Sequence, residues 1–108
     1  MKKPTDFAYH LTNFLTTHMV GRRGLSVNTV RSYRDTFKLF LQFCADSKSI
    51  SAGRLTLKNF DRDLVLDFMT YLEENRNAGN STLNQRLAAV YAFVKYLQIE
   101  EPIYILEY

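Results

Sequence analysis

The chain offers few side chains of the kinds that perform covalent chemistry. Its two histidines, His10 and His18, lack an accompanying cluster of Cys, Asp or Glu at metal-ligand spacing, so we predict no metal site. No serine stands in a nucleophile-elbow setting, and no phosphate loop or dinucleotide fingerprint is present. A tyrosine acts as a nucleophile only among cations. No Arg and His cluster accompanies the helical tyrosines, which we interpret as core or rim residues: Tyr33, Tyr71, Tyr91 and Tyr96. We therefore predict no catalytic residues, no cofactor and no small-molecule ligand.

Side chains that hydrogen-bond phosphates and base edges are better represented. On the expected helix over residues 25–48 they are Asn28, Thr29, Arg31, Ser32 and Lys38. On a second expected helix, which begins near residue 80, they are Ser81, Thr82, Asn84, Gln85, Arg86 and Lys95. Arg22 and Arg23 lie between two glycines, which let the backbone come close to another surface. An exposed arginine is more often a solvated charge than a DNA contact. The prediction of DNA binding therefore depends on the set of polar and basic side chains on both helices and not on any single residue.

Within this set we assign two kinds of contact with DNA. Hydroxyls and free amides at a helix N-terminus form a seat for phosphate, as residues 80–82 would. The predicted phosphate contacts are Arg22, Arg23, Ser81 and Lys95. The predicted base or groove contacts are Asn28, Thr29, Arg31, Ser32, Asn84 and Gln85. Lys38, Thr82 and Arg86 are predicted to contact DNA without a more specific assignment.

The distribution of charge supports an anionic partner. The net charge is only +3, but residues 1–54 carry a net charge of +6 and residues 55–108 a net charge of −3. A domain polarised in this way suits a polyanion on one side. The single cysteine, Cys44, excludes an intrachain disulfide and suits a reducing compartment. Polar residues interrupt the N-terminal apolar run that a signal peptide or membrane span would need, so we expect a cytoplasmic protein with no membrane partner.

Four helices are expected to position these side chains. Ser26 is the expected N-cap of the organising helix, whose apolar stripe is Val30, Tyr33, Phe37, Phe40, Leu41 and Cys44. The first helix should run from Thr5 and Asp6 to Gly21, with one face formed by Phe7, Leu11, Phe14, Leu15 and His18 or Met19. The third should begin at an Asp61 cap and bury Leu64, Val65, Phe68, Met69 and Leu72. The fourth should bury Leu83, Leu87, Val90, Val94 and Leu97.

Two further features complete the expected arrangement. The third helix exposes a run of carboxylates, which should turn away from a polyanion: Asp61, Asp63, Asp67, Glu73 and Glu74. Pro102 should end the last helix, and residues 103–108 alternate in the manner of an extended segment. The sequence therefore predicts an all-α fold, a compact four-helix bundle with short loops and an extended C-terminal tail.

Two ordered motifs resemble a known family. The first is Ser26-Val-Asn28-Thr29-Val30-x-x-Tyr33, followed by Phe37, Phe40-Leu41 and Phe43, and the second is Ser81-Thr82-x-Asn84-x-Arg86-Leu87, followed by Phe93 and Tyr96-Leu97. Over about residues 7–100 the chain resembles the N-terminal SAM-like, or core-binding, domain of phage-integrase-type tyrosine recombinases. The resemblance implies a four-helix domain that arches over one side of duplex DNA, with its second and fourth helices towards the major groove.

The resemblance also implies that the catalytic residues belong to a separate C-terminal domain. On this view residues 1–102 are the core-binding domain, residues 103–108 begin a linker to an absent catalytic domain, and the fragment is not an enzyme by itself. Its expected partners are double-stranded DNA at a recombination site and other recombinase protomers, in a bacterial, phage or mobile-element protein. The alternative is a helical protein-interaction domain for oligomer assembly, which would dock through residues 103–108 and the acidic third helix.

Overall fold

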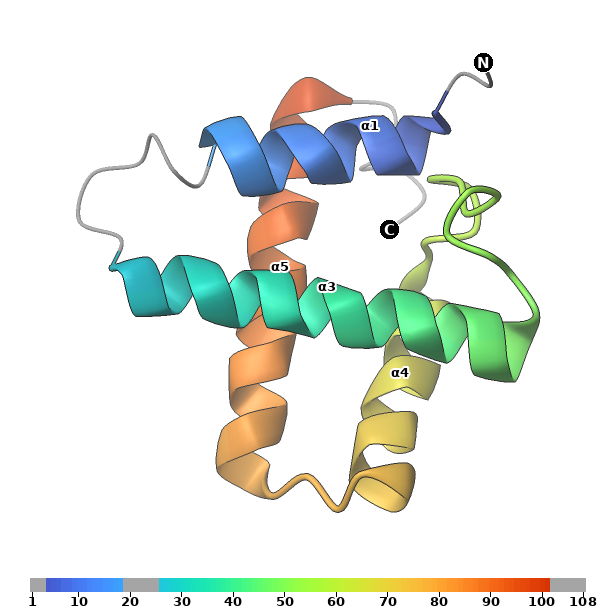
Figure 1. Cartoon of the computed structure of the whole chain (residues 1–108), viewed down its shortest axis with the longest axis vertical. Helices are drawn as coiled ribbons and strands as arrows, with labels where there is room; N and C mark the ends of the chain where they lie inside the picture. Colours follow the sequence, from blue (N-terminus) through green and yellow to red (C-terminus); the bar gives the residue numbers. More distant parts are fainter. Residues whose placement is uncertain (1–3, 19–25, 102–108) are drawn as a thin grey trace.

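The longest described helix, α3 (Val27–Lys48), crosses the middle of the molecule (Figure 1). We analysed a computed structural model, which describes residues 4–18 and 26–101. The predicted cap is confirmed, because the Ser26 hydroxyl accepts a hydrogen bond from the Thr29 amide at 3.0 Å. At the other end Ser49 adopts a left-handed conformation, with φ 57°, and its N–H donates to the Cys44 carbonyl. Both ends of α3 are thus determined by local sequence.

The other elements are α1 (Asp6–Asn13), the π-helical turn η1 (Phe14–His18), α4 (Arg62–Asn75) and α5 (Asn80–Glu100). In Figure 1, α1 and η1 run antiparallel to α3, while α5 crosses α3 steeply and runs antiparallel to α4. No strand occurs among the described residues, so the predicted all-α four-helix fold is confirmed. Within the same residues no helix is both long and apolar enough to cross a bilayer. The predicted extended tail lies outside the described residues.

The first helical segment differs from its prediction. We expected one α-helix up to Gly21, but regular α-helix ends at Asn13 and gives way to η1. A π-helical turn is wider than an α-helical turn, so residues four apart come closer to alignment along the axis. Phe14 and His18 accordingly stack, with ring centroids 5.8 Å apart, and both rings contact Tyr96 of α5. The aromatic contacts with α5 account for the departure from regular helix.

The core is built mainly from phenylalanine. Phe93 of α5 lies at its centre, with its ring centroid 5.2–5.6 Å from those of Phe7, Phe14, Phe37 and Phe60. Edge-to-face and tilted geometries dominate these contacts, as the quadrupole of an aromatic ring favours. Aromatic side chains from α1, η1, α3, α5 and the loop before α4 therefore share one centre.

The predicted apolar faces are mostly confirmed, but the buried surface is wider. Val30, Tyr33, Leu41, Met69, Leu83 and Leu87 are only partly buried. Several buried residues lie outside the predicted apolar faces. They are Phe43, Ala89, Phe93 and Tyr96 on the helices and Leu55, Leu57 and Phe60 in the loop before α4. The reason is that α3 and α5 each pack against several neighbours, so each buries more than one narrow stripe. A helical wheel cannot count those neighbours.

The loop between α3 and α4 is tied to the start of α1. The Thr5 hydroxyl donates to the Leu55 carbonyl at 2.6 Å, and an Asp6 carboxylate oxygen accepts from the Leu57 amide at 2.9 Å. Leu57 and Phe60 are buried, so this segment packs against the core. Asp61 then caps α4, as predicted, by accepting from the Leu64 amide at 2.9 Å.

The thiol of Cys44 is buried in the core, and burial raises its pKa from 9.0 to about 11. Because the pKa of this thiol is higher in the folded chain than in the unfolded chain, its protonated form stabilises the fold. This contribution is complete below pH 9 and is lost as the pH rises towards 11. At pH 8 the folded thiol should also hold roughly a hundredfold less thiolate than the unfolded one, and only the thiolate is nucleophilic. We therefore expect Cys44 to react far more slowly with a chromogenic disulfide in buffer than in guanidinium chloride. Equal rates in the two conditions would contradict this prediction.

Candidate nucleic-acid interface

The first two turns of α3 and residues 85–88 of α5 meet around an open hollow of about 290 Å³. Four of the six residues that line it come from α3 and two from α5; they are Asn28, Thr29, Ser32, Tyr33, Gln85 and Ala88. The lining carries amide and hydroxyl groups and no carboxylate. Two helices that are distant in sequence thus present neutral hydrogen-bonding groups to one space.

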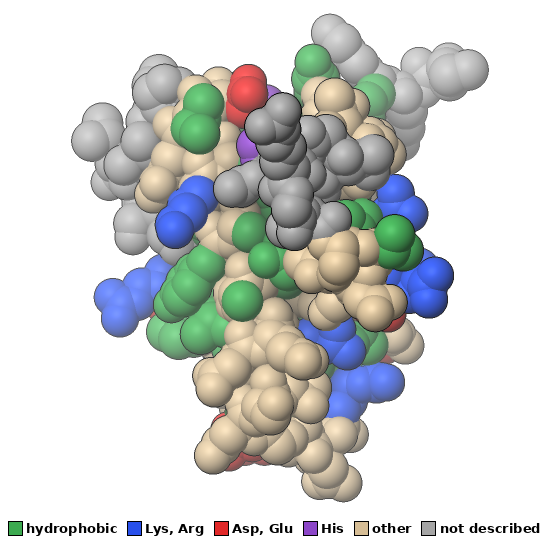
Figure 2. Space-filling model, turned by 90° about the vertical axis from the view of Figure 1, so that its left-hand side faces the viewer, with side chains coloured by type: hydrophobic (Ala, Val, Ile, Leu, Met, Phe, Trp, Pro, Cys, Tyr) green, Lys and Arg blue, Asp and Glu red, His purple; other side chains and the backbone are tan. Residues whose placement is uncertain are grey.

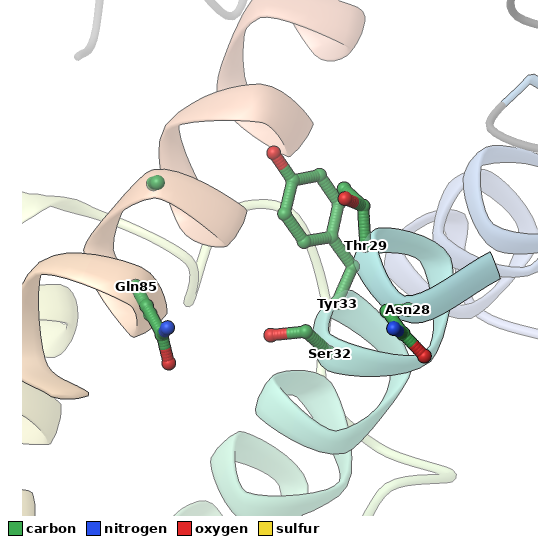
Figure 3. Close-up of a pocket in the computed structure, with 6 residues that line it drawn as sticks. Asn28, Thr29, Ser32, Tyr33 and Gln85 are labelled. Atoms are coloured by element: carbon green, nitrogen blue, oxygen red, sulfur yellow. The ribbon is translucent and has the colours of Figure 1, made fainter. Parts of the chain in front are cut away.

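Helical spacing explains why these residues share the hollow. On α3 they lie at intervals of one, three and four residues, and on α5 the two are three apart, so each set occupies one face. In Figure 3 the Ser32 hydroxyl is directed towards Gln85 and the Tyr33 hydroxyl towards α5, while the Asn28 amide lies at the outer rim and points away. The Tyr33 ring stacks on Phe14, with centroids 6.4 Å apart, so the core supports the wall of the hollow.

The start of α5 suits an anion. Its N-cap residue is Gly79, which makes no side-chain capping hydrogen bond, and no acidic residue occurs in the first turn. Ser81 and Thr82 are exposed there. The amides of a helix's first turn lack partners within the helix and carry the positive end of its dipole, so a phosphate group would be stabilised at this end. The phosphate contact at residues 80–82 stays a prediction.

The other predicted contact residues are distributed around the hollow rather than within it. Thr29 and Ser32 are half-buried in its wall, whereas the exposed residues of the predicted set are Asn28, Arg31, Lys38, Ser81, Thr82, Asn84, Gln85 and Lys95. Arg31 lies one turn after Asn28 on α3. Lys38 and Lys95 lie further along their helices and do not line the hollow. Arg22 and Arg23 lie outside the described residues.

Arg86 differs from the others. We predicted it on the outer surface of the last helix, but the structure places it half-buried against α3. Its Nη1 donates to the Thr36 hydroxyl at 3.1 Å and to the Ser32 carbonyl at 3.4 Å. The cause is Thr36, a fully buried hydroxyl at the crossing of the two helices, which offers a polar partner inside the apolar interface. A threonine on the inner face of α3 is the sequence signal for such a partner.

Two other residues of the hollow were missed as contact candidates. Tyr33 was interpreted only as a core or rim residue, yet it forms part of the wall. Ala88 has no polar group, and its small side chain leaves room beside Gln85. Its sequence signal was the presence of small residues on the surface of the last helix, which permits close approach of another molecule. A search for hydrogen-bonding side chains would find the Tyr33 hydroxyl but not Ala88.

Acidic side chains are kept away from the hollow. The predicted acidic residues at the start and on the surface of α4 are all exposed, and none lines the hollow: Asp61, Asp63, Asp67, Glu73 and Glu74. Asp67 forms an ion pair with Lys48, with a nitrogen–oxygen distance of 2.7 Å. Figure 2 views the side on which α3 begins; hydrophobic side chains and several basic ones are visible on it, and acidic side chains are fewer than basic ones. The charge of this face therefore favours an anionic partner.

Comparison with known proteins gives a consistent result. Residues 12–101 match the family described as phage integrase, N-terminal SAM-like domain. Two curated relatives from Sinorhizobium fredii are named "Putative integrase/recombinase": y4rD is 33% identical over 92 residues, covering 85% of this chain and 33% of the relative, and y4rC is 30% identical over 102 residues, covering 94% and 31%. "Tyrosine recombinase XerC" of Herpetosiphon aurantiacus is 34% identical over 93 residues, covering 86% and 28%.

These relatives are considerably longer than the chain, which spans about a third of their length. No solved structure gives a significant match. The comparisons therefore rest on sequence, and the matched region contains both motifs that surround the hollow.

Proposed function

The chain belongs to the phage integrase N-terminal SAM-like domain family, and from that premise we propose that it is the DNA-holding domain of a site-specific tyrosine recombinase. In this role it grips one side of the duplex at a crossover site during DNA integration or recombination. The observation that carries the proposal is the hollow between α3 and α5, which is lined by amides and hydroxyls and by no carboxylate.

The chemistry of the two helices supports binding to a duplex. Amide side chains such as those of Asn28 and Gln85 can bond two atoms of a base edge in the major groove, while hydroxyls bond either bases or phosphates. Arg31, Lys38 and Lys95 are exposed cations on the same two helices, and phosphate neutralisation by such cations supplies much of the affinity of DNA-binding proteins. The uncapped start of α5 adds amide donors for a phosphate. In this proposal α3 and α5 lie towards the groove and α4 away from it.

The division of labour within the parent protein is also part of the proposal. The named relatives are about three times as long as this chain, so the remaining two thirds of such a protein have room for a separate catalytic domain. We propose that residues 1–102 hold the DNA, that residues 103–108 begin the connection to that domain, and that strand cleavage and rejoining occur there. Other protomers would assemble with this one on the recombination site.

A salt titration tests the DNA-binding proposal. Each neutralised phosphate releases counterions and contributes about −0.9 to the slope of log K against log salt concentration. With three predicted contact cations exposed on the two helices, Arg31, Lys38 and Lys95, we expect a slope of roughly −2 or steeper. The measurement is the fluorescence anisotropy of a labelled 30-base-pair duplex titrated with the 108-residue chain at several salt concentrations. A slope near zero, or no binding at low salt, would overturn the proposal.

A second candidate function, assembly with further copies of this chain, is favoured by one observation. Between α4 and α5 lies a mainly apolar groove of about 430 Å³, lined by Arg62, Val65, Leu66, Met69, Leu87 and Tyr91. Leu66 and Tyr91 are 51% and 53% exposed, which is high for large apolar side chains. An apolar contact responds little to salt, so sedimentation of the chain without DNA, at low and high salt, separates this function from binding to phosphates.

A further inference from the structure

The side chain of Arg86 joins the two helices that form the hollow. Arg86 directly follows Gln85 on α5, and its guanidinium crosses to α3. There it reaches two acceptors one turn apart, the Ser32 carbonyl and the Thr36 hydroxyl. Ser32 of α3 and Gln85 of α5 line opposite walls of the hollow. Arg86 therefore joins the two walls directly beside these residues.

We propose that Arg86 is a positioning residue, which sets the separation and register of α3 and α5 for DNA, and that it is not itself a phosphate contact. The inference rests on the proposed DNA-binding function. The sequence had suggested Arg86 as a direct DNA contact because of its residue type and its place on α5. The inference replaces that role with a structural one.

The hydrogen bonds explain why the link is specific. The Thr36 hydroxyl donates its own proton to the Ser32 carbonyl at 2.9 Å, so its lone pairs are left to accept from Arg86. Bonds from a charged donor are stronger than bonds between neutral groups, and the planar guanidinium fixes their direction. Because Thr36 is fully buried, water cannot replace Arg86 as its donor without opening the helix crossing. The three groups therefore hold one relative placement of the helices.

The geometry also argues against a phosphate contact. Nη1 already donates to two acceptors on α3, and Nε is buried with no hydrogen-bond partner among the described residues. A buried unpaired donor destabilises the fold, so this placement carries a free-energy cost that an aliphatic side chain would avoid. A bidentate phosphate contact needs two free N–H groups on one edge of the guanidinium. One edge contains Nη1, which is bonded to α3, and the other contains Nε, which is buried, so neither edge is free for a phosphate.

The test compares affinity with salt dependence. We expect Arg86→Gln to lower DNA affinity about tenfold while leaving the slope of log K against log salt unchanged. The matched control is Lys95→Gln, which removes one charge from the exposed surface of the same helix and should flatten the slope by about 0.9. Flattening of the slope by about 0.9 in Arg86→Gln would overturn the proposal and make Arg86 a phosphate contact.

A double-mutant cycle tests the partner on α3. Thr36→Val removes the buried hydroxyl, which cannot touch DNA, and should reproduce the loss of affinity at an unchanged slope, whereas Thr36→Ser should bind as the wild type does. Combined with Arg86→Gln, Thr36→Val should add little further loss, because both changes break one link. Fully additive losses would overturn the proposal. Should Arg86→Gln fail to fold, as judged by circular dichroism, the comparison of Thr36→Val with Thr36→Ser carries the same test.

The two proposals fail in different ways. A wild-type chain that binds no DNA overturns the proposed function. In that case the free energies of unfolding of the same variants still test the contact between Arg86 and Thr36. Non-additive destabilisation in the double variant supports a link between α3 and α5, and additive destabilisation excludes one.

Discussion

Replacing Phe93 by alanine is expected to lower the free energy of unfolding by about 3–5 kcal/mol, the largest effect we predict for a single substitution. The ring is fully buried and contacts Phe7, Phe14, Phe37 and Phe60, which come from four different segments of the chain. Alanine would leave a cavity where these rings meet, and rings held by their own helices cannot collapse into it completely. A loss of that size is a large fraction of the stability of a domain this small.

Urea denaturation followed by circular dichroism measures this effect. The matched control is Ile99→Ala, on the same helix, because Ile99 is 73% exposed and should change the free energy of unfolding by no more than about 0.5 kcal/mol. A loss below about 1.5 kcal/mol for Phe93→Ala would mean that the site repacks, and that Phe93 is not the centre on which the helices depend.

Replacing Arg31 by alanine is expected to weaken DNA binding by about 1–3 kcal/mol, or roughly 5- to 150-fold. Arg31 is exposed on α3, one turn from Asn28 at the rim of the hollow. An arginine can donate two hydrogen bonds to one guanine, and a pair of this kind accounts for the upper end of the range. The measurement is the anisotropy titration of the labelled duplex at fixed salt.

The control for Arg31→Ala is Arg54→Ala. Arg54 is also exposed, but it lies in the loop after α3, so this variant removes the same charge outside the two helices of the proposed interface. We expect it to change the affinity less than twofold, as a general long-range charge effect would. A larger loss from Arg54→Ala than from Arg31→Ala would reverse the proposed orientation of the domain on DNA.

Helix starts could be predicted from the sequence because capping is a local interaction. The side chains of Thr5, Ser26 and Asp61 each accept a hydrogen bond from an amide three residues further on, so the spacing along the chain is sufficient to recognise them. Apolar periodicity identified most of the core in the same way. It missed Phe43 and Phe93, since periodicity does not say how many neighbours cover a helix.

The candidate interface could be predicted only in part. The residue types on α3 and α5 indicated DNA, and the segregation of acidic residues to α4 indicated which helix faces away. Which of these residues share one hollow depends on where α3 and α5 cross, and the sequence contains no direct measure of that crossing. Asn28 and Gln85 line the same hollow, while Lys38 and Lys95 do not, although all four were predicted to contact DNA.

The sequence by itself determined the class of fold, the start of each helix and the two helices that carry cations and amides, because all of these follow from contacts within a few turns of chain. Tertiary structure alone decided that η1 widens to stack Phe14 on His18, and that Arg86 turns inward to Thr36. Thr36 and Arg86 are 50 residues apart, and their contact exists only because packing of the apolar faces brings α3 and α5 together. The direction of a half-buried polar side chain is set by its partner across such a crossing, and no local pattern specifies that partner.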